Sequence, residues 1–315
     1  MPTEAEGAAR PAGAWGRLTE VGRTLYAAGR AWVDDNAMRL SAATAMYTIL
    51  SLSPLLVITI KVLAVAFGDR AADRQVSRQL EGFLGPTGAE AVRGMIAETV
   101  RPGAGVLATV VSIGVLLFTA SGVFAELRDS LNALWGVAPR LGRRWWAAVR
   151  DRFQLIGMVF VVGFLLLVSQ AVTTALTVMS EFVVGGAGWA ATAIDFGAST
   201  LVVALLFALI FRLLPDVELA WRDVLFGAVV TALLFKVGQY LLALYFTHGS
   251  TASVYGAAGS FVVVLLWVYY SCWILFYGAE LIQVRLHRQG RKVTPSADAR
   301  LAHADDESDT GSPRS

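Results

Sequence analysis

The chain has 315 residues, of which 56% are hydrophobic and only 16% are charged, and its mean hydropathy is +0.60. Together with several apolar runs of about 20 residues or more, this composition favours a polytopic membrane protein over a soluble domain. The formal net charge of +2 says little about partners, because loop cations set membrane topology instead. The single cysteine, Cys272, and three scattered histidines exclude an intramolecular disulfide and offer no metal-ligand spacing.

The N-terminal region divides into two parts. Residues 1–20 are rich in Ala, Gly, Glu and Arg without a hydrophobic period, and we expect them to be disordered in the cytoplasm. Residues 1–30 lack the apolar core of a signal peptide, so we expect insertion to depend on the first internal span. From Val21 to Arg39, apolar residues recur at helical spacing among arginines. This pattern predicts a short amphipathic helix at the cytoplasmic membrane surface, with an ordinary linker as the alternative.

Six apolar stretches follow, each long enough to cross a bilayer as a helix. Pro54 falls near the middle of the first, where the missing backbone donor predicts a helix kink. The predicted spans are residues 40–67, 103–124, 153–179, 196–214, 224–246 and the helix within 249–283. The predicted fold class is all-α: over residues 21–285, a polytopic membrane helix bundle with six transmembrane helices plus short amphipathic interfacial and external helices.

Two segments lie outside the predicted spans. Within 68–102, apolar residues at helical spacing surround a Gly85-Pro86 break, which predicts two short amphipathic helices on the outer face of the bundle. These helices would either form a lid or simply pack on the bundle. Residues 286–315 are expected to form a disordered cytoplasmic tail, since the sequence after Arg300 has almost no apolar content.

Loop charges predict the orientation. Lysine and arginine gather in residues 1–39, in the 125–152 loop, beside the 215–223 turn and after residue 283, whereas the loops at 180–195 and 247–256 contain none. The positive-inside rule therefore places both termini in the cytoplasm. Only the 68–102 segment, with five arginines, goes against this orientation.

The stretch 249–283 carries two helical faces of interest. Small residues recur every fourth position, which predicts close packing of two helix backbones; they are Ala252, Gly256 and Ser260. Four residues spaced three or four apart form what we call the polar stripe: Tyr269, Trp273, Tyr277 and Glu280. Aromatic hydroxyls and an acid at membrane depth are expected to face protein or a wet cavity rather than lipid.

Lys236 lies near the middle of the fifth predicted span, and Gln239 and Tyr240 lie one turn further on. A lysine at this depth could bind an anionic headgroup or join a proton relay, and bending toward the nearer interface is the alternative. Glu280 differs from it in depth by roughly 14 Å, so we expect no direct pairing.

Enzyme signatures are missing from the sequence. It contains no phosphate-binding loop of the GxxxxGK[ST] type, no HExxH zinc motif and no GxSxG elbow. No basic-aromatic module for nucleic acid is present either. The sequence therefore predicts a protein that is not an enzyme, needs no cofactor and binds no nucleic acid.

Four blocks carry a resemblance to a known family. They are SAATAMYTILSLSPLL at 41–56, TASGVFAELRDSLNALWGV at 119–137, FRLLPDVELAWRDVLFGA at 211–228 and SVYGAAGSFVVVLLWVYYSCWILFYGAEL at 253–281. Over residues 25–285 the chain resembles the YihY/BrkB family of bacterial inner-membrane proteins. The resemblance implies six spans with both ends inside the cell. Members have been called ribonuclease BN, virulence factor or transporter. In the family pattern a lysine often follows the glycine of span five, where this chain has Gln239.

These observations lead to the hypothesis of an inner-membrane transporter or flippase for an amphiphilic, anionic lipid-like or small-molecule substrate. The residues expected to line its path are Lys236, Gln239, Tyr240, Tyr269, Tyr270, Trp273, Tyr277 and Glu280. The alternative is a membrane scaffold of envelope machinery that transports nothing, and the nuclease label fits no motif. Membrane lipids are the expected partners, and a homo-oligomer is left open.

Overall fold

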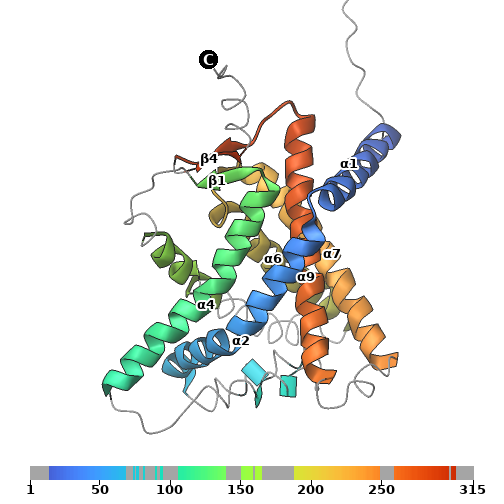
Figure 1. Cartoon of the computed structure of the whole chain (residues 1–315). Helices are drawn as coiled ribbons and strands as arrows, with labels where there is room; N and C mark the ends of the chain where they lie inside the picture. The colour runs from blue at the N-terminus through green and yellow to red at the C-terminus, as the bar shows by residue number, and fades with distance from the viewer. Residues whose placement is uncertain are drawn as a thin grey trace, which may run out of the picture.

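The computed structural model describes most of the predicted membrane domain. The described residues are 14–68, 106–139, 150–158, 160–164, 188–248, 259–297 and 299–302, with scattered positions between 74 and 94. In these ranges the long helices are α1 (Ala14–Asp34), α2 (Ala37–Phe67), α4 (Val106–Leu134), α6 (Gly188–Leu213), α7 (Trp221–His248) and α9 (Gly259–Arg288) (Figure 1).

The long helices follow the predicted spans closely. Among the described residues, three helices are long and apolar enough to cross a membrane, over Phe196–Leu213, Trp221–Leu242 and Val262–Arg288. These stretches match the predicted fourth, fifth and sixth spans. Helices α2 and α4 contain the predicted first span and most of the second. The predicted third span is described only as far as residue 164, where its described residues are helical.

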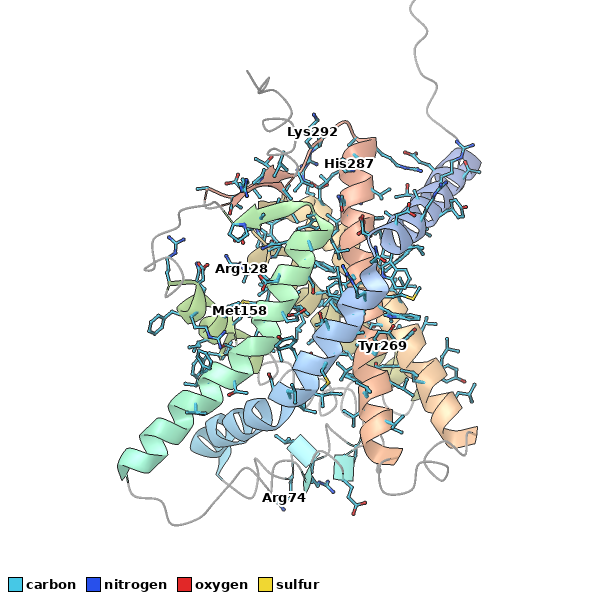
Figure 2. All side chains as sticks on the ribbon, viewed as in Figure 1. Arg74, Arg128, Met158, Tyr269, His287 and Lys292 are labelled. Carbon is cyan, nitrogen blue, oxygen red and sulfur yellow. The ribbon has the colours of Figure 1, made fainter. Side chains whose placement is uncertain are left out.

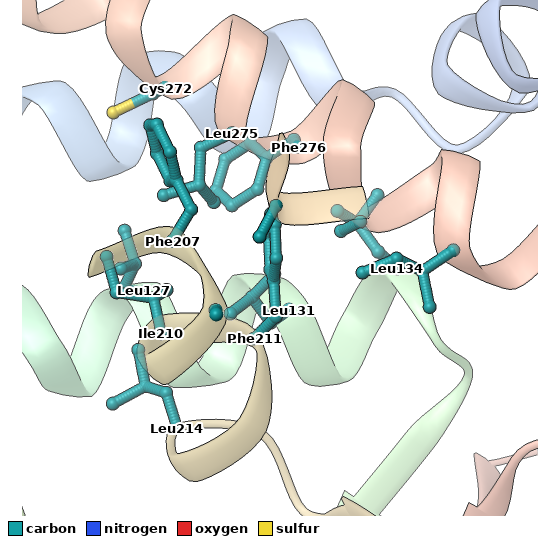
Figure 3. Packing of buried hydrophobic residues seen from close by; sticks show 14 of the residues in the cluster. Leu127, Leu131, Leu134, Phe207, Ile210, Phe211, Leu214, Cys272, Leu275 and Phe276 are labelled. Atoms are coloured by element: carbon teal, nitrogen blue, oxygen red, sulfur yellow. The ribbon is translucent and has the colours of Figure 1, made fainter. Parts of the chain in front are cut away.

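Helix α9 occupies the centre of the arrangement. It packs against α1, α2 and α7, while α2 also packs against α4 and α6 packs against α7 (Figure 1). Buried apolar side chains fill the space where α4, α6 and α9 meet, as Figure 3 shows for Leu131, Phe211 and Phe276. All three are fully buried in the structure. The central position of α9 means that residues on several of its faces are enclosed by protein.

Glycines let α7 and α9 approach closely. A Cβ atom added at Gly278 of α9 would overlap Oγ1 of Thr231 on α7 and lie 3.0 Å from Cζ of Phe211. Added Cβ atoms at Gly227 and Gly238 of α7 would overlap side-chain atoms of α9. Such contacts between small residues replace the hydrophobic drive that lipid does not supply. The predicted small-residue face stays a prediction, because Ala252, Gly256 and the Ser260 side chain lie outside the described residues.

Helix α1 is longer than the predicted surface helix and ends earlier. Its chain turns at Asp35 and Asn36, where Asn36 has a φ of 54°, a left-handed conformation that asparagine tolerates. On the helix, Ala28 is fully buried against the bundle whereas Val21 is 48% exposed. One part of the predicted apolar face, at Ala28, therefore packs on the bundle, and another part, at Val21, stays exposed.

Two small sheets correct the all-α prediction. Strand β1 (Val137–Pro139) pairs with β4 (Ala299–Leu301), and β2 (Val217–Glu218) pairs with β3 (Thr294–Pro295), both antiparallel. Each strand has only two or three residues, too few to show a period of two in the sequence. These sheets also correct the prediction of disorder from residue 286, because α9 continues to Arg288 and residues 294–301 supply β3 and β4. Residues 303–315 lie outside the described part.

One end of the molecule collects the N-terminal helix and the strands. Helix α1, the C-terminal end of α9 and the β1–β4 sheet lie together there, and His287 and Lys292 are at the same end (Figures 1 and 2). Arg74, from the 68–102 segment, lies at the opposite end (Figure 2). Few positions of that segment are described, so the two predicted external helices are not tested; an Arg93–Glu81 ion pair at 2.6 Å lies within it.

Candidate functional site

The polar stripe of α9 faces α1. The indole of Trp273 meets that of Trp32 edge to face, with ring centroids 5.4 Å apart, and Tyr269 contacts Trp273 in the same way at 5.1 Å. One turn further along, the hydroxyl of Tyr277 donates a hydrogen bond to the Leu25 carbonyl at 3.0 Å. The stripe thus lies against protein, as its polarity predicts.

We expect Tyr277→Phe to loosen this contact. The substitution leaves the Leu25 carbonyl without the hydroxyl donor, and the loss of one such hydrogen bond costs about 1 kcal/mol. Limited proteolysis should cut α1 faster in the variant, and unfolding in mixed detergent micelles should show the lower stability. Tyr240→Phe is the matched control, since Tyr240 on α7 is 71% exposed. Equal behaviour of the two variants would contradict a docked α1.

Glu280 ends the stripe in the interior of the protein. Its side chain is 1% exposed, and neither carboxylate oxygen has a hydrogen-bond partner among the described residues. The Asp35 carboxyl lies close enough to Glu280 to act on it electrostatically. Asp35 is in the exposed turn between α1 and α2. Burial of a carboxyl without a cation or donor is unfavourable, so this position is functionally the most informative in the described chain.

Unpaired polar atoms accompany the acid on the same helices. The indole N–H groups of Trp32 and Trp273 are buried and have no partner among the described residues, and the same holds for Oε1 of Gln283. Native proteins pair most buried polar groups, and each exception requires an explanation. Their concentration along the contact between α1 and α9 marks this contact, which we call the α1–α9 polar contact, as the candidate site.

The predicted path residues of α7 lie elsewhere. Lys236 and Gln239 are half-buried, whereas Tyr240 is exposed. Tyr270 is the path residue of α9 that turns toward α7, because its ring occupies the space a Cβ at Gly238 would need. The structure therefore places the polar stripe on the side of α9 that faces α1 and Tyr270 on the side that faces α7. Neither carboxylate oxygen of Glu280 has a hydrogen-bond partner among the described residues, Lys236 included.

Pro54, the predicted kink, lies within α2, which is helical without interruption from Ala37 to Phe67. Its side chain is outside the described atoms, and the kink stays a prediction. No group of three or more His, Cys, Asp or Glu residues that could hold a metal ion occurs in the described ranges.

Sequence reasoning missed a largely buried ionic network where α4 and α6 end. The guanidinium of Arg128 donates to both carboxylate oxygens of Asp216, at 2.6 and 3.1 Å, and lies 3.4 Å from the Asp151 carboxylate. Asn132 donates to the same Asp216 carboxylate at 2.9 Å and accepts the Asp216 backbone N–H at 2.8 Å. Although burial favours the neutral form, the hydrogen bond and charge of Asp216 raise the pKa of Arg128 above its ordinary value.

This network borders a polar recess of about 290 Å³ that Arg128, Gln154, Asp216 and Ser296 help to line. The backbone N–H of Ser296 donates to the Asp216 carbonyl at 2.9 Å, which ties the C-terminal segment to the network. The Arg128 charge is already neutralised by the carboxylates of Asp216 and Asp151. We therefore interpret the network as a structural contact rather than a binding site. From the sequence alone, Arg128 contributed only to the predicted membrane orientation. No sequence pattern relates it to Asp216, which lies 88 positions away.

The helices and their enclosed polar groups define an α-helical membrane protein with several candidate membrane-crossing helices. The chain belongs to the Virulence factor BrkB family, which matches residues 28–302. This membership confirms the family resemblance of the four sequence blocks.

Relatives of the chain are named as UPF0761 membrane proteins. One from Idiomarina loihiensis is 26% identical over 192 residues, which cover 60% of this chain and 66% of the relative. One from Kangiella koreensis is 24% identical over 261 residues, covering 82% of this chain and 62% of the relative. A third, from Rhodospirillum centenum, is 27% identical over 287 residues, covering 89% and 61%. The chain thus spans less than two thirds of the length of these relatives. No solved structure matches it.

Proposed function

We propose that this protein is a transporter or flippase of the bacterial cytoplasmic membrane that moves an amphiphilic, anionic lipid-like substrate. The observation that supports it most is Glu280, buried within a membrane-crossing helix with both carboxylate oxygens unpaired in the described chain. Intramembrane ionisable groups are costly, and they typically mark substrate or ion pathways. A helix that served only to anchor the chain would not need such a group.

The anionic character of the substrate rests on Lys236. This cation lies in the candidate membrane-crossing stretch of α7 and is half-buried, so it is held partly within protein at membrane depth. A lysine in that position suits a phosphate or carboxylate headgroup, whose acyl chains would stay in the lipid. A scaffold without transport activity is the competing function, and it requires neither Lys236 nor Glu280.

We propose six spans with both termini in the cytoplasm. Helix α4 is followed by β1, α6 by β2 and α9 by β3. Strand β1 pairs with β4, and β2 pairs with β3. The described strands that follow α4, α6 and α9 therefore lie near one another in the structure, and Arg212, Arg222 and Arg291 flank them in the sequence. A single positively charged side is the arrangement that the positive-inside rule assigns to the cytoplasm.

Lipid movement in vesicles tests the function. We expect purified protein in liposomes to expose NBD-labelled phosphatidylglycerol of the inner leaflet to external dithionite. Lys236→Ala and Glu280→Gln should each slow this movement at least about tenfold, or about 1.4 kcal/mol in barrier height. The matched controls are Lys292→Ala and Glu218→Gln, which alter exposed residues outside the membrane-crossing helices. If both test variants moved the lipid as fast as their controls, the transport assignment would lose its basis.

A further inference from the structure

Glu280 lies in the interior of the protein without a charge partner among the described residues. Its carboxyl is 1% exposed, and no described residue donates a hydrogen bond to either oxygen. A carboxylate withdrawn from water in this way requires a cation, a hydrogen-bond donor or a bound proton. The occupant that balances this carboxyl must therefore come from outside the described chain.

Among the residues that the structure describes, no cation on the elements packed against α9 pairs with Glu280. The turn between α1 and α2 contributes the Asp35 carboxyl, which has the same sign of charge as Glu280. From α4, the indole of Trp135 donates to the Ala279 carbonyl at 3.3 Å. Helix α7 contributes the small residues Gly227 and Thr231, which lie against Ile282 and Gly278. No lysine, arginine or histidine of the described chain forms an ion pair or hydrogen bond with Glu280.

The surroundings of Glu280 favour a proton over a divalent metal cation. Calcium takes about six to eight oxygen ligands, several of them carboxylates, and magnesium takes about six. In the described ranges no group of three or more His, Cys, Asp or Glu residues could contribute to such a set of ligands. A proton needs one carboxylate oxygen and no additional space, which suits a side chain enclosed by protein. Asp35 is exposed, so it connects the buried carboxyl with water.

We propose that Glu280 is the proton-binding site of the transport cycle and that Asp35 relays its proton to and from water. The inference rests on the proposed transport function and names the ion that drives it. A proton from water binds the Asp35 carboxylate, passes to one Oε atom of Glu280 and leaves Asp35 ionised again. The return step releases the same proton, so no bond other than O–H forms or breaks. Movement of α1 against α9 would change the contact between the two carboxyls during the cycle.

Infrared spectroscopy of the full-length protein over a pH series tests the site without any substrate. We expect a carboxyl C=O band that titrates in the wild type and is lost in Glu280→Gln. In Asp35→Asn the band should persist with its midpoint moved, because a neighbouring ionisable group has been removed. Glu218→Gln, at an exposed position of β2, should retain the wild-type band and midpoint.

Two results would overturn the proposal. One is a Glu280→Gln spectrum that keeps every titrating carboxyl band of the wild type. The other is an unmoved midpoint in Asp35→Asn, which decides the matter even if Glu280→Gln does not fold, since Asp35 lies in an exposed turn.

The same preparations separate this proposal from the proposed function. If labelled phosphatidylglycerol does not move in wild-type vesicles but the Glu280 band behaves as expected, the substrate assignment fails and the proton site stands. If the lipid moves and the band survives in Glu280→Gln, transport stands and the proton site fails.

Discussion

Replacing Gly278 with alanine is expected to destabilise the protein by about 3 kcal/mol, the upper part of the usual range for overpacking a core. The new methyl group would overlap Oγ1 of Thr231 and lie 3.0 Å from Cζ of Phe211, both fully buried. Thr231 cannot easily turn away, because its hydroxyl donates to the Gly227 carbonyl at 2.7 Å. Unfolding of the purified protein in mixed detergent micelles measures the loss.

Two further variants make the interpretation specific. Gly197→Ala on α6 is the matched control, because nothing lies within 4 Å of an added Cβ there, and its effect should stay within about 1 kcal/mol. Thr231→Ala removes the atom that the new methyl overlaps, so the double variant Gly278→Ala/Thr231→Ala should recover part of the loss. Equal stability of Gly278→Ala and Gly197→Ala would show that α7 and α9 lie further apart than described.

Replacing Arg128 with methionine is expected to cost about 3 to 5 kcal/mol, the usual result of removing one partner of a buried ion pair. The side chains of Arg128 and Asp216 are only 12% and 13% exposed, so the substitution leaves the Asp216 carboxylate buried with Asn132 as its remaining side-chain donor. Because the pair joins α4 to the segment after α6, the variant should also free the strands at this end. The same unfolding experiment measures the stability, and proteolysis of residues 291–302 measures the release.

An exposed pair provides the comparison for Arg128. Arg30 and Asp34 on α1 are 3.9 Å apart with side chains 76% and 68% exposed, and such pairs contribute little. Arg30→Met should therefore unfold like the wild type. If Arg128→Met did the same, the network would be a surface feature, and the recess beside it would become a candidate binding site.

The sequence predicted the long elements well because membrane helices need uninterrupted apolar stretches. The predicted spans at 196–214 and 224–246 match α6 and α7 within a few residues at three of their four ends, and α6 starts earlier, at Gly188. The orientation of the polar stripe also followed from local spacing, since residues three and four apart share a helix face. These are properties of one segment at a time.

Contacts between distant segments could not be predicted in this way. The Asp35–Glu280 proximity joins a turn near the N-terminus to the last helix, and no local pattern relates the two residues. The close contact of Gly278 with Thr231 depends on how α9 and α7 are aligned with each other. No pattern in a single sequence predicts that alignment. Strands of two or three residues, such as β2, depend on their partner β3 for their conformation rather than on propensity.

The inward orientation of the polar stripe underlies both proposals, and spin labels test it directly. With Cys272, the only cysteine, replaced by serine, single cysteines at Trp273 and Tyr240 carry the label in lipid vesicles. Collision with lipid-dissolved oxygen should be strong for the label at position 240, which is 71% exposed on α7, and weak for the label at position 273, which lies against Trp32. Equal oxygen accessibility at the two positions would mean that the stripe faces the acyl chains, which would contradict the inward orientation on which both proposals rest.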